Sequence, residues 1–294
     1  MTRFTCRHLS DVLSRDVDFP YAVDQGEPVT LELADCHGYF PGADPPPPTL
    51  GANPVTGPLA IRGVVPGDTI AVEVQHIAPI GAGHLGQRGD PIEIPVDAES
   101  WTARLAPGFE VPLAPMVGTI GVAPGGPPVD THRAGDHGGN MDCNIVQAGT
   151  TVCFNVSAPG AGLGLGDMHA VMGDGEVSGQ GIECAAVVEL RVHKVAGLSV
   201  RRPYGLRADR FFIVGWGSTL EEAADMAQAD MVELLLRLTD LSEDMARRFL
   251  GIGTHLRVGW RGGATPTVWL EVSRAMLPTS AWDEITGGVG EPLG

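Results

Sequence analysis

The chain has 294 residues, of which 43% are apolar and 5% aromatic, and its formal net charge is −17. This length is enough for one large globular domain or two ordinary ones. So acidic a protein repels phosphate backbones and anionic lipid, which argues against a nucleic-acid or membrane partner and favours a neutral or cationic small molecule.

Short strands account for most of the elements that the sequence predicts. Apolar and polar residues alternate in Val29–Leu33, Thr69–Ile77 and Val187–Val192, which is the period of a half-buried strand. The chain also contains 41 glycines and 24 prolines, so we expect many tight turns and stiff loops such as Asp44–Pro48. These features together predict a β-rich body.

Two helices interrupt the strands late in the chain. The first is expected to begin at the N-cap Ser218, with Glu221 completing a capping box, and to continue to about Leu238. The second is expected from Ser242 through Phe249. Because each has an apolar face, we expect an αα-hairpin packed on the sheets before the chain returns to strand.

The cysteines and the beginning of the chain indicate a cellular compartment. Five cysteines form no CxxC pair, and an odd number cannot all be joined in disulfides, which is typical of a reducing environment. The first residues lack the apolar core of a signal sequence, and no apolar run is long enough to span a bilayer. We therefore expect a cytoplasmic protein.

Candidate metal ligands are densest between residues 132 and 183. Asn140 and Asp142 are two residues apart, as are Asp167 and His169, so on extended backbone each pair would project from one face and could meet a common cation. Aspartate beside glycine usually marks a turn, but turn chemistry does not explain histidine and glutamate among so many apolar residues. An enzyme site is the first hypothesis.

Several ordered motifs in this stretch follow a known pattern. The chain has Gly-Gly-Asn-x-Asp, Gly-Asp-x-His-Ala, Gly-Asp-Gly-Glu-Val and a later Glu, at Gly138–Asp142, Gly166–Ala170, Gly173–Val177 and Glu183. This block resembles that of the acetamidase/formamidase family. Further matching segments lie upstream, at Asn53–Pro58, Gly67–Thr69, Pro115–Gly118 and Ile120–Val122. The resemblance covers most of the chain.

The resemblance also implies an architecture. The family's fold is a β-rich sandwich-and-barrel assembly with a small α/β element, and its members are usually oligomeric. Combined with the predicted strands and helix pair, this gives a mainly β fold with a late αα-hairpin. We expect one acetamidase/formamidase-like unit over residues 1–294, with the helical insertion at about 218–250, assembled as a homo-oligomer.

The sequence gives little support to amidase mechanisms that use a nucleophilic side chain. Lys194 is the only lysine and lies in an alternating strand, which counts against Ser-Ser-Lys and Glu-Lys-Cys amidases. No GxSxG elbow occurs, and Ser218 in the nearest segment fits a helix cap better. Cys143 and Cys184 are expected to be small buried groups. Metal-assisted hydrolysis remains.

Such hydrolysis needs a cation that polarises the amide oxygen and activates water, with a nearby carboxylate to move the proton. Catalytic zinc usually has about three protein ligands, drawn from His, Asp, Glu and Cys. Asp142, His169 and Glu183 could be these ligands. Asp35 lies in the segment that matches the family's early Glu-x-x-Asp-Ala/Cys motif and could complete or bridge the site. We expect a divalent cation, with zinc preferred.

Three carboxylates are candidates for the catalytic role, namely Asp167, Glu176 and Glu183. Asp167 precedes His169 by two residues and could orient its ring or bind the metal directly. Glu176 ends a Gly-Asp-Gly-Glu turn that could aim its carboxylate inward. Glu183 and Glu176 are rivals for the general base, and the residues alone do not decide between them.

The remaining histidines are weaker candidates. His137 is a further possible ligand, but the family's block varies before Gly138, and His132 is weaker still. His84, His193 and His255 are expected to be hydrogen-bonded surface or strand histidines, since an isolated histidine without a spaced carboxylate says little about ligation.

The sequence therefore predicts metal-dependent hydrolysis of a small neutral amide, and the resemblance implies formamide or acetamide. The segment Ala82–Asp90 departs from what formamidases would have and is expected to form part of the pocket wall, so lactams and longer amides stay open. The alternative is a structural Ca²⁺ in the same acidic cluster, in a binding protein or an inactive relative. His169 argues against calcium because imidazole favours zinc.

Overall fold

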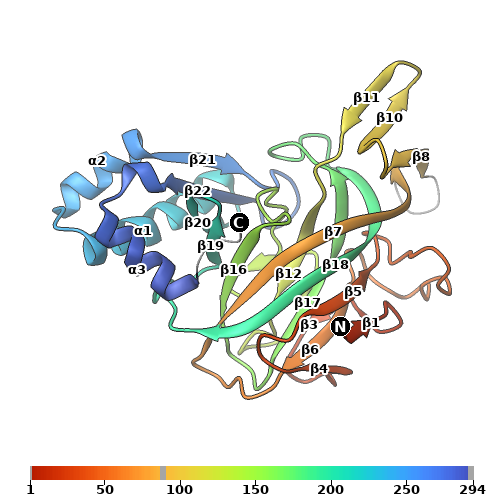
Figure 1. Ribbon diagram of the computed structural model, residues 1–294, viewed down its shortest axis with the longest axis horizontal. Helices are drawn as coiled ribbons and strands as arrows, with labels where there is room; N and C mark the ends of the chain where they lie inside the picture. Colours follow the sequence, from red (N-terminus) through yellow and green to blue (C-terminus); the bar gives the residue numbers. More distant parts are fainter. Residues whose placement is uncertain (1, 87–90, 291–294) are drawn as a thin grey trace.

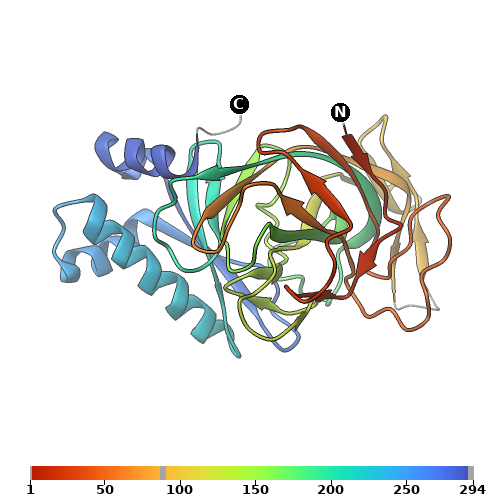
Figure 2. The same cartoon turned by 90° about the horizontal axis from the view of Figure 1, so that it is seen from below.

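Most strands of the computed structural model, which describes residues 2–86 and 91–290, join in one curled sheet (Figure 1, Figure 2). Its two longest strands, β7 (Thr69–Leu85) and β18 (Ile182–Val195), pair antiparallel along most of their length. The sheet continues from them through β5 (Val29–Leu33), β17 (Ala161–Val171), β6 (Val55–Ile61), β12 (Met116–Gly121), β15 (Gly138–Asn140) and β16 (Thr150–Asn155). Inside the curl lies the larger hydrophobic core.

The other strands of the body are short. They are β1 (Thr2–Phe4), β2 (Leu9–Ser10), β3 (Val12–Leu13), β4 (Tyr21–Val23), β8 (Ile92–Ile94), β9 (Val96–Asp97), β10 (Thr102–Ala106), β11 (Phe109–Pro112), β13 (Val129–Asp130) and β14 (Ala134–Gly135). Strands β9, β10 and β11 form a separate small sheet, and β10 and β11 project from the body as a hairpin (Figure 1). Residues 87–90, the end of the segment expected to line the pocket, lie outside the described residues.

A second layer of structure is built from the carboxy-terminal part of the chain. Strand β16 pairs with β19 (Tyr204–Arg207), and the sheet continues through β20 (Arg210–Trp216), β22 (Thr267–Ser273) and β21 (Thr254–Val258). Three helices lie beside these strands, at one end of the molecule (Figure 1): α1 (Leu220–Leu238), α2 (Glu243–Gly253) and α3 (Thr279–Val289). A one-turn 3₁₀ helix, η1 (Arg274–Met276), precedes α3. The second hydrophobic core packs between helices and strands, with Met231, Phe211 and Trp282 among its members.

The structure confirms the mainly β fold with a late helix pair and a small α/β element. Strand β5 has the predicted bounds, whereas β7 continues well beyond Ile77. The organisation of residues 1–294 as one unit stays a prediction. Within the described part of the chain, no helix has both the length and the apolar character needed to cross a membrane.

The start of α1 differs from the prediction by one residue. The N-cap is Thr219, whose hydroxyl accepts a hydrogen bond from the Glu222 backbone N–H at 3.1 Å. Ser218 lies outside the helix, and its backbone N–H donates to the Glu222 carboxylate at 2.8 Å. The sequence offers two overlapping hydroxyl-to-glutamate pairs here, and the structure uses the second one for capping.

Candidate active site

A cavity of about 480 Å³ opens at the point where β15, β17 and β18 bring the predicted residues together. Its wall contains Asp142, Asp167, His169, Glu176 and Glu183. All five side chains are at least 90% buried. Thus five of the six predicted site residues meet at one place, although they come from strands and turns spread over more than forty positions of the chain.

His169 is at the centre of this group because two neighbouring strands hold its ring. In the antiparallel register His169 lies opposite Glu183 on β18 and opposite Met116 on β12. Its Nε2 atom lies 3.0 Å from Glu183 Oε1 and 3.5 Å from Glu176 Oε1, while Nδ1 lies 3.1 Å from the sulfur of Met116. The imidazole therefore presents Nε2 to two carboxylates.

A chain of hydrogen bonds fixes the other two carboxylates. Asn53 Nδ2 donates to Asn140 Oδ1 and to Asp167 Oδ2, both at 2.8 Å. The hydroxyl of Thr119 also donates to Asn140 Oδ1, at 2.7 Å. Asn140 in turn donates through Nδ2 to Asp142 Oδ2 at 2.7 Å. This network occupies one oxygen of each aspartate and orients both side chains before any ligand binds.

Four site residues have left-handed backbone, which non-glycine residues rarely adopt. Their φ angles are 52° at Asn53, 45° at Asp142, 56° at Asp167 and 41° at Glu176. Such conformations persist where the surrounding structure imposes them, and they gather at functional sites. The expectation of extended backbone from Asn140 to Asp142 was wrong, because β15 ends at Asn140 and the chain turns. The two side chains still meet, through that turn.

The group holds more negative charge than the surrounding protein compensates. Four carboxylates face a single imidazole, and Asp142 Oδ1 and Glu183 Oε2 are buried with no hydrogen-bond partner among the described residues. Burial raises the pKa of Asp142 to about 7, against the opposing effect of His169. Burial and the neighbouring Asp142 raise the pKa of Asp167 well above its usual range. Buried charge of this kind needs protons or a cation.

Two overlapping groups of donor atoms among the described residues are close enough to share a cation, and the predicted set of Asp142, His169 and Glu183 is not itself one of these groups. One ligand atom from each of Asp142, Asp167 and His169 lies within 4.8 Å of the others, and the same is true of His169, Glu176 and Glu183. Burial alone would lower the pKa of His169, but Glu183 and Glu176 raise it well above the ordinary value. An excess of oxygen donors around one imidazole, with two oxygens unpaired, fits a divalent metal ion.

Asp35, the sixth predicted residue, lies just outside this group. Its Oδ1 accepts hydrogen bonds from the backbone N–H groups of His37 and Tyr39, at 2.8 and 2.9 Å, and its Oδ2 lies 2.8 Å from His84 Nε2. Its neighbours Cys36 and His37 line the cavity instead. Ligation by Asp35 stays a prediction, and His84 is a hydrogen-bonded strand histidine as expected.

The weaker candidates divide between two cavities. His132 lines the active-site cavity. His137 lines a neighbouring cavity of about 840 Å³, where burial lowers its pKa to about 4.

The thiols near the site are not poised as nucleophiles. Cys143 and Cys184 are buried as expected, and burial raises the pKa of Cys184 to about 12 and that of Cys143 well above its usual value. Burial and the charges of Glu183 and Asp167 also raise the pKa of Cys36. Thiols held in their protonated form are poor nucleophiles.

Two residues that sequence reasoning missed complete the site. Trp260 lines the cavity, and its indole N–H is buried without a hydrogen-bond partner in the described structure. Gly118 on β12 lies beneath the aspartates, where an added Cβ would come within 2.5 Å of Asp142 Oδ1 and 2.8 Å of Asp167 Oδ2. No motif in the sequence marks Trp260. Gly118 lies in the matching segment Pro115–Gly118, but nothing in that segment indicates contact with the aspartates.

Comparison with known proteins finds a family whose sequence model matches this region of the chain. The sequence model of the Acetamidase/Formamidase family matches residues 129–211, which contain the five residues of the cluster. A Schizosaccharomyces pombe protein that is provisionally named a formamidase is 26% identical over 251 residues. That match covers 60% of this chain and 61% of the relative, so it spans less than two thirds of the relative's length.

Two crystal structures share the whole fold. A predicted acetamidase/formamidase from the thermophile Thermoanaerobacter tengcongensis is 27% identical, with 99% of each chain covered and a TM-score of 0.85. An acetamidase from Bacillus halodurans is also 27% identical, with 98% of this chain and 100% of that chain covered and a TM-score of 0.86. The matching motifs, the family model over residues 129–211 and these two folds together show that the chain is similar to the acetamidase/formamidase family.

Proposed function

We propose that the protein hydrolyses a small neutral amide to a carboxylate and ammonia, and that it does so with a bound divalent cation. The observation that carries the proposal is the buried cluster in the matched region, where Asp142 Oδ1 and Glu183 Oε2 lack hydrogen-bond partners within the described structure. His169 Nε2 lies 3.0 Å from the other oxygen of Glu183, Oε1. The similarity to the acetamidase/formamidase family supports the class of reaction.

Asp142, His169 and Glu183 would hold the cation. Glu183 lies opposite His169 on the neighbouring strand β18. Asn140 hydrogen-bonds Oδ2 of Asp142, which leaves Oδ1 free to bind the cation. When bound, the cation would polarise the amide carbonyl and lower the pKa of water. The imidazole in the donor set favours a zinc-class ion over calcium.

Proton transfer falls to Glu176. Its carboxylate is buried in the cavity wall on a turn rather than a strand, 3.5 Å from His169 Nε2. A general base must reach both the attacking water and the departing amine, and a carboxylate on irregular backbone beside the cluster can serve both. Asp167 accepts hydrogen bonds at Oδ2 from Asn53 and Thr119, which suits an orienting role.

Substrate recognition would use the remaining cavity wall. The indole N–H of Trp260 is a donor without a protein acceptor among the described residues, so it can bind a carbonyl or carboxylate oxygen of the ligand. The net charge of −17 and the acidic wall disfavour anionic substrates. Formamide and acetamide are the first substrates to test. A cavity of about 480 Å³ also has room for lactams and longer amides.

We extend the proposal to the protein's surroundings. Cys6, Cys36, Cys143, Cys153 and Cys184 are all free thiols, which supports a cytoplasmic location. The resemblance to the family implies a homo-oligomer, and the strongly acidic composition disfavours nucleic-acid and membrane partners.

The purified protein is expected to release ammonia from short aliphatic amides, to lose that activity in a strong chelator and to regain it when Zn²⁺ is restored, because the cation supplies the polarising charge. Ammonia release over a panel from formamide to a γ-lactam measures this directly.

A protein that holds metal but hydrolyses no amide would favour the alternative role of a metal-stabilised binding protein. Full activity after complete metal removal, or a covalent adduct trapped on Cys143 or Cys184, would overturn the mechanism.

A further inference from the structure

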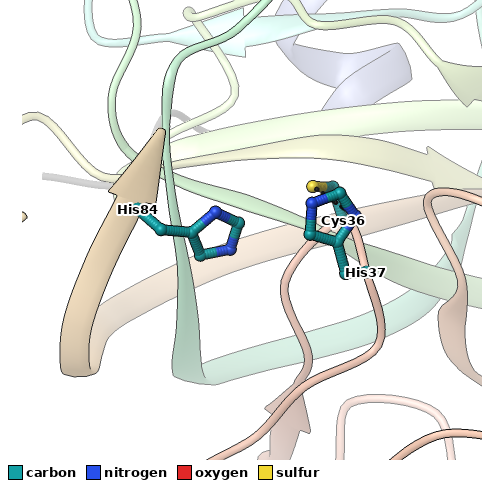
Figure 3. A group of neighbouring side chains, drawn as sticks. All are labelled: Cys36, His37 and His84. Atoms are coloured by element: carbon teal, nitrogen blue, oxygen red, sulfur yellow. Dashed lines mark hydrogen bonds between the residues drawn. The ribbon is translucent and has the colours of Figure 1, made fainter. Parts of the chain in front are cut away.

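Three side chains beside the acidic cluster face one another (Figure 3). Cys36 and His37 lie on the loop that follows β5, and His84 lies near the end of β7. One ligand atom from each lies within 4.8 Å of the other two. Cys36 Sγ lies 3.5 Å from His37 Nδ1, and the rings of His37 and His84 stack with centroids 5.2 Å apart. A thiol and two imidazoles thus meet at one point.

The hydrogen bonding of His84 leaves one ring nitrogen without a partner among the described residues. Nε2 lies 2.8 Å from Asp35 Oδ2, and a carboxylate can only accept, so Nε2 carries the proton of that bond. The other nitrogen, Nδ1, is buried and has no hydrogen-bond partner among the residues that the structure describes. A histidine that binds metal through one nitrogen almost always donates the other N–H to a carboxylate or carbonyl. His84 has that arrangement already.

Asp35 also supports the second histidine. Its Oδ1 accepts hydrogen bonds from the backbone N–H groups of His37 and Tyr39, which closes the turn that carries Cys36 and His37. One buried carboxylate therefore fixes both the backbone of this loop and the ring of His84. Asp35 therefore positions the neighbouring side chains. This role differs from direct ligation in the acidic cluster.

We propose that Cys36, His37 and His84 form a second metal site, which takes a zinc-class divalent cation and adjoins the acidic cluster. One thiolate and two imidazoles are a donor set that zinc prefers, whereas calcium and magnesium require oxygen. Cys36 and His37 line the active-site cavity, so a fourth position would open onto it. Cys36 Sγ also lies within 4.8 Å of ligand atoms of Asp167 and Glu183, so the two sites are neighbours.

The second metal site can be tested independently of amide hydrolysis, because the experiment measures metal binding and not turnover. Chelator-treated protein is titrated with Co²⁺, a spectroscopic substitute for zinc. Cobalt bound to a thiolate gives an intense charge-transfer band in the near ultraviolet, which carboxylate and imidazole ligands alone do not give. Wild-type protein is expected to bind about two equivalents of Co²⁺ per chain, one of them with the band.

Variants then separate the two sites. Cys36→Ser, His37→Gln and His84→Gln are each expected to remove the thiolate band and about one equivalent of Co²⁺, while His169→Asn removes the other equivalent and keeps the band. His255→Gln changes an exposed histidine on β21 and is expected to keep both equivalents. Cooperative thermal unfolding is checked for each variant.

Asp35→Asn provides a test that keeps all three ligands. Loss of the carboxylate that orients His84 is expected to weaken Co²⁺ binding at the thiolate site by about 10 to 100-fold. The proposal is overturned if wild-type protein shows no thiolate band, or if the band survives in both His37→Gln and His84→Gln, which would assign Cys36 to the acidic cluster. Intact binding at both sites in a protein without amidase activity would contradict the proposed function and leave this inference standing.

Discussion

Replacing Glu176 by glutamine is expected to lower amide turnover by about two to four orders of magnitude while the protein keeps its metal, because the amide cannot accept the proton that general-base catalysis transfers. Replacing Glu183 by glutamine is expected to lower metal occupancy as well as turnover. The two glutamates differ in their setting, since Glu183 lies on β18 opposite His169 with Oε2 unpaired in the described structure, whereas Glu176 lies on a turn.

Steady-state ammonia release and metal content by mass spectrometry distinguish the two roles. Glu189→Gln is a matched control, since Glu189 lies on the same strand, outside the cavity, and is partly exposed. The reverse outcome, with metal lost only from Glu176→Gln, would exchange the assignments of base and ligand. Near-normal turnover in both variants would show that neither carboxylate carries the proton, and the cluster would then not be the catalytic centre.

Gly118→Ala is expected to reduce kcat by about 100-fold, because displacement of catalytic groups by about 1 Å has effects of this size. The added Cβ would lie within 2.5 Å of Asp142 Oδ1 and within 2.8 Å of both the backbone oxygen and Oδ2 of Asp167, so these groups must move. Neither aspartate can move freely, since Asn140 and Asn53 hold them in the buried network.

Gly251→Ala is the matched control for this glycine. Gly251 lies in α2, where an added Cβ would meet nothing within 4 Å, so the substitution is expected to leave kcat unchanged. Thermal unfolding of both variants shows whether the fold is retained. Wild-type kcat in folded Gly118→Ala would mean that the positions of Asp142 and Asp167 do not matter to the reaction.

The elements that could be predicted are those in which apolar and polar residues recur at a regular spacing. Alternation located Val29–Leu33 with its true bounds, since the fully buried Val29, Leu31 and Leu33 alternate with polar residues. Strands β12 and β17 were not found by the alternation of apolar and polar residues because nearly all their side chains are buried. Their polar residues Thr119, Asp167 and His169 are buried as well, so polarity does not distinguish two faces of these strands. Helix α3 was also missed, although Ala281, Ile285 and Val289 repeat every fourth position on its buried face.

The candidate site likewise has a part that the sequence indicates and a part that it does not. Residue types and motifs pointed to Asp142, His169 and Glu183, and the register of β17 and β18 explains why the last two meet. The supporting contacts could not be predicted, because they join segments far apart in the chain: Asn53 and Asp167 are separated by 114 positions. The left-handed turn at Asp142 was likewise invisible, since short polar residues tolerate that conformation only when tertiary contacts impose it.

On our proposal, the buried acidic cluster holds the cation that amide hydrolysis requires. Anomalous diffraction at the zinc absorption edge, from crystals of protein that releases ammonia, tests it most directly. We predict an anomalous peak roughly 2.0–2.3 Å from a side-chain donor of each of Asp142, His169 and Glu183. Active protein whose crystals show no anomalous peak within bonding distance of these three residues would contradict the claim.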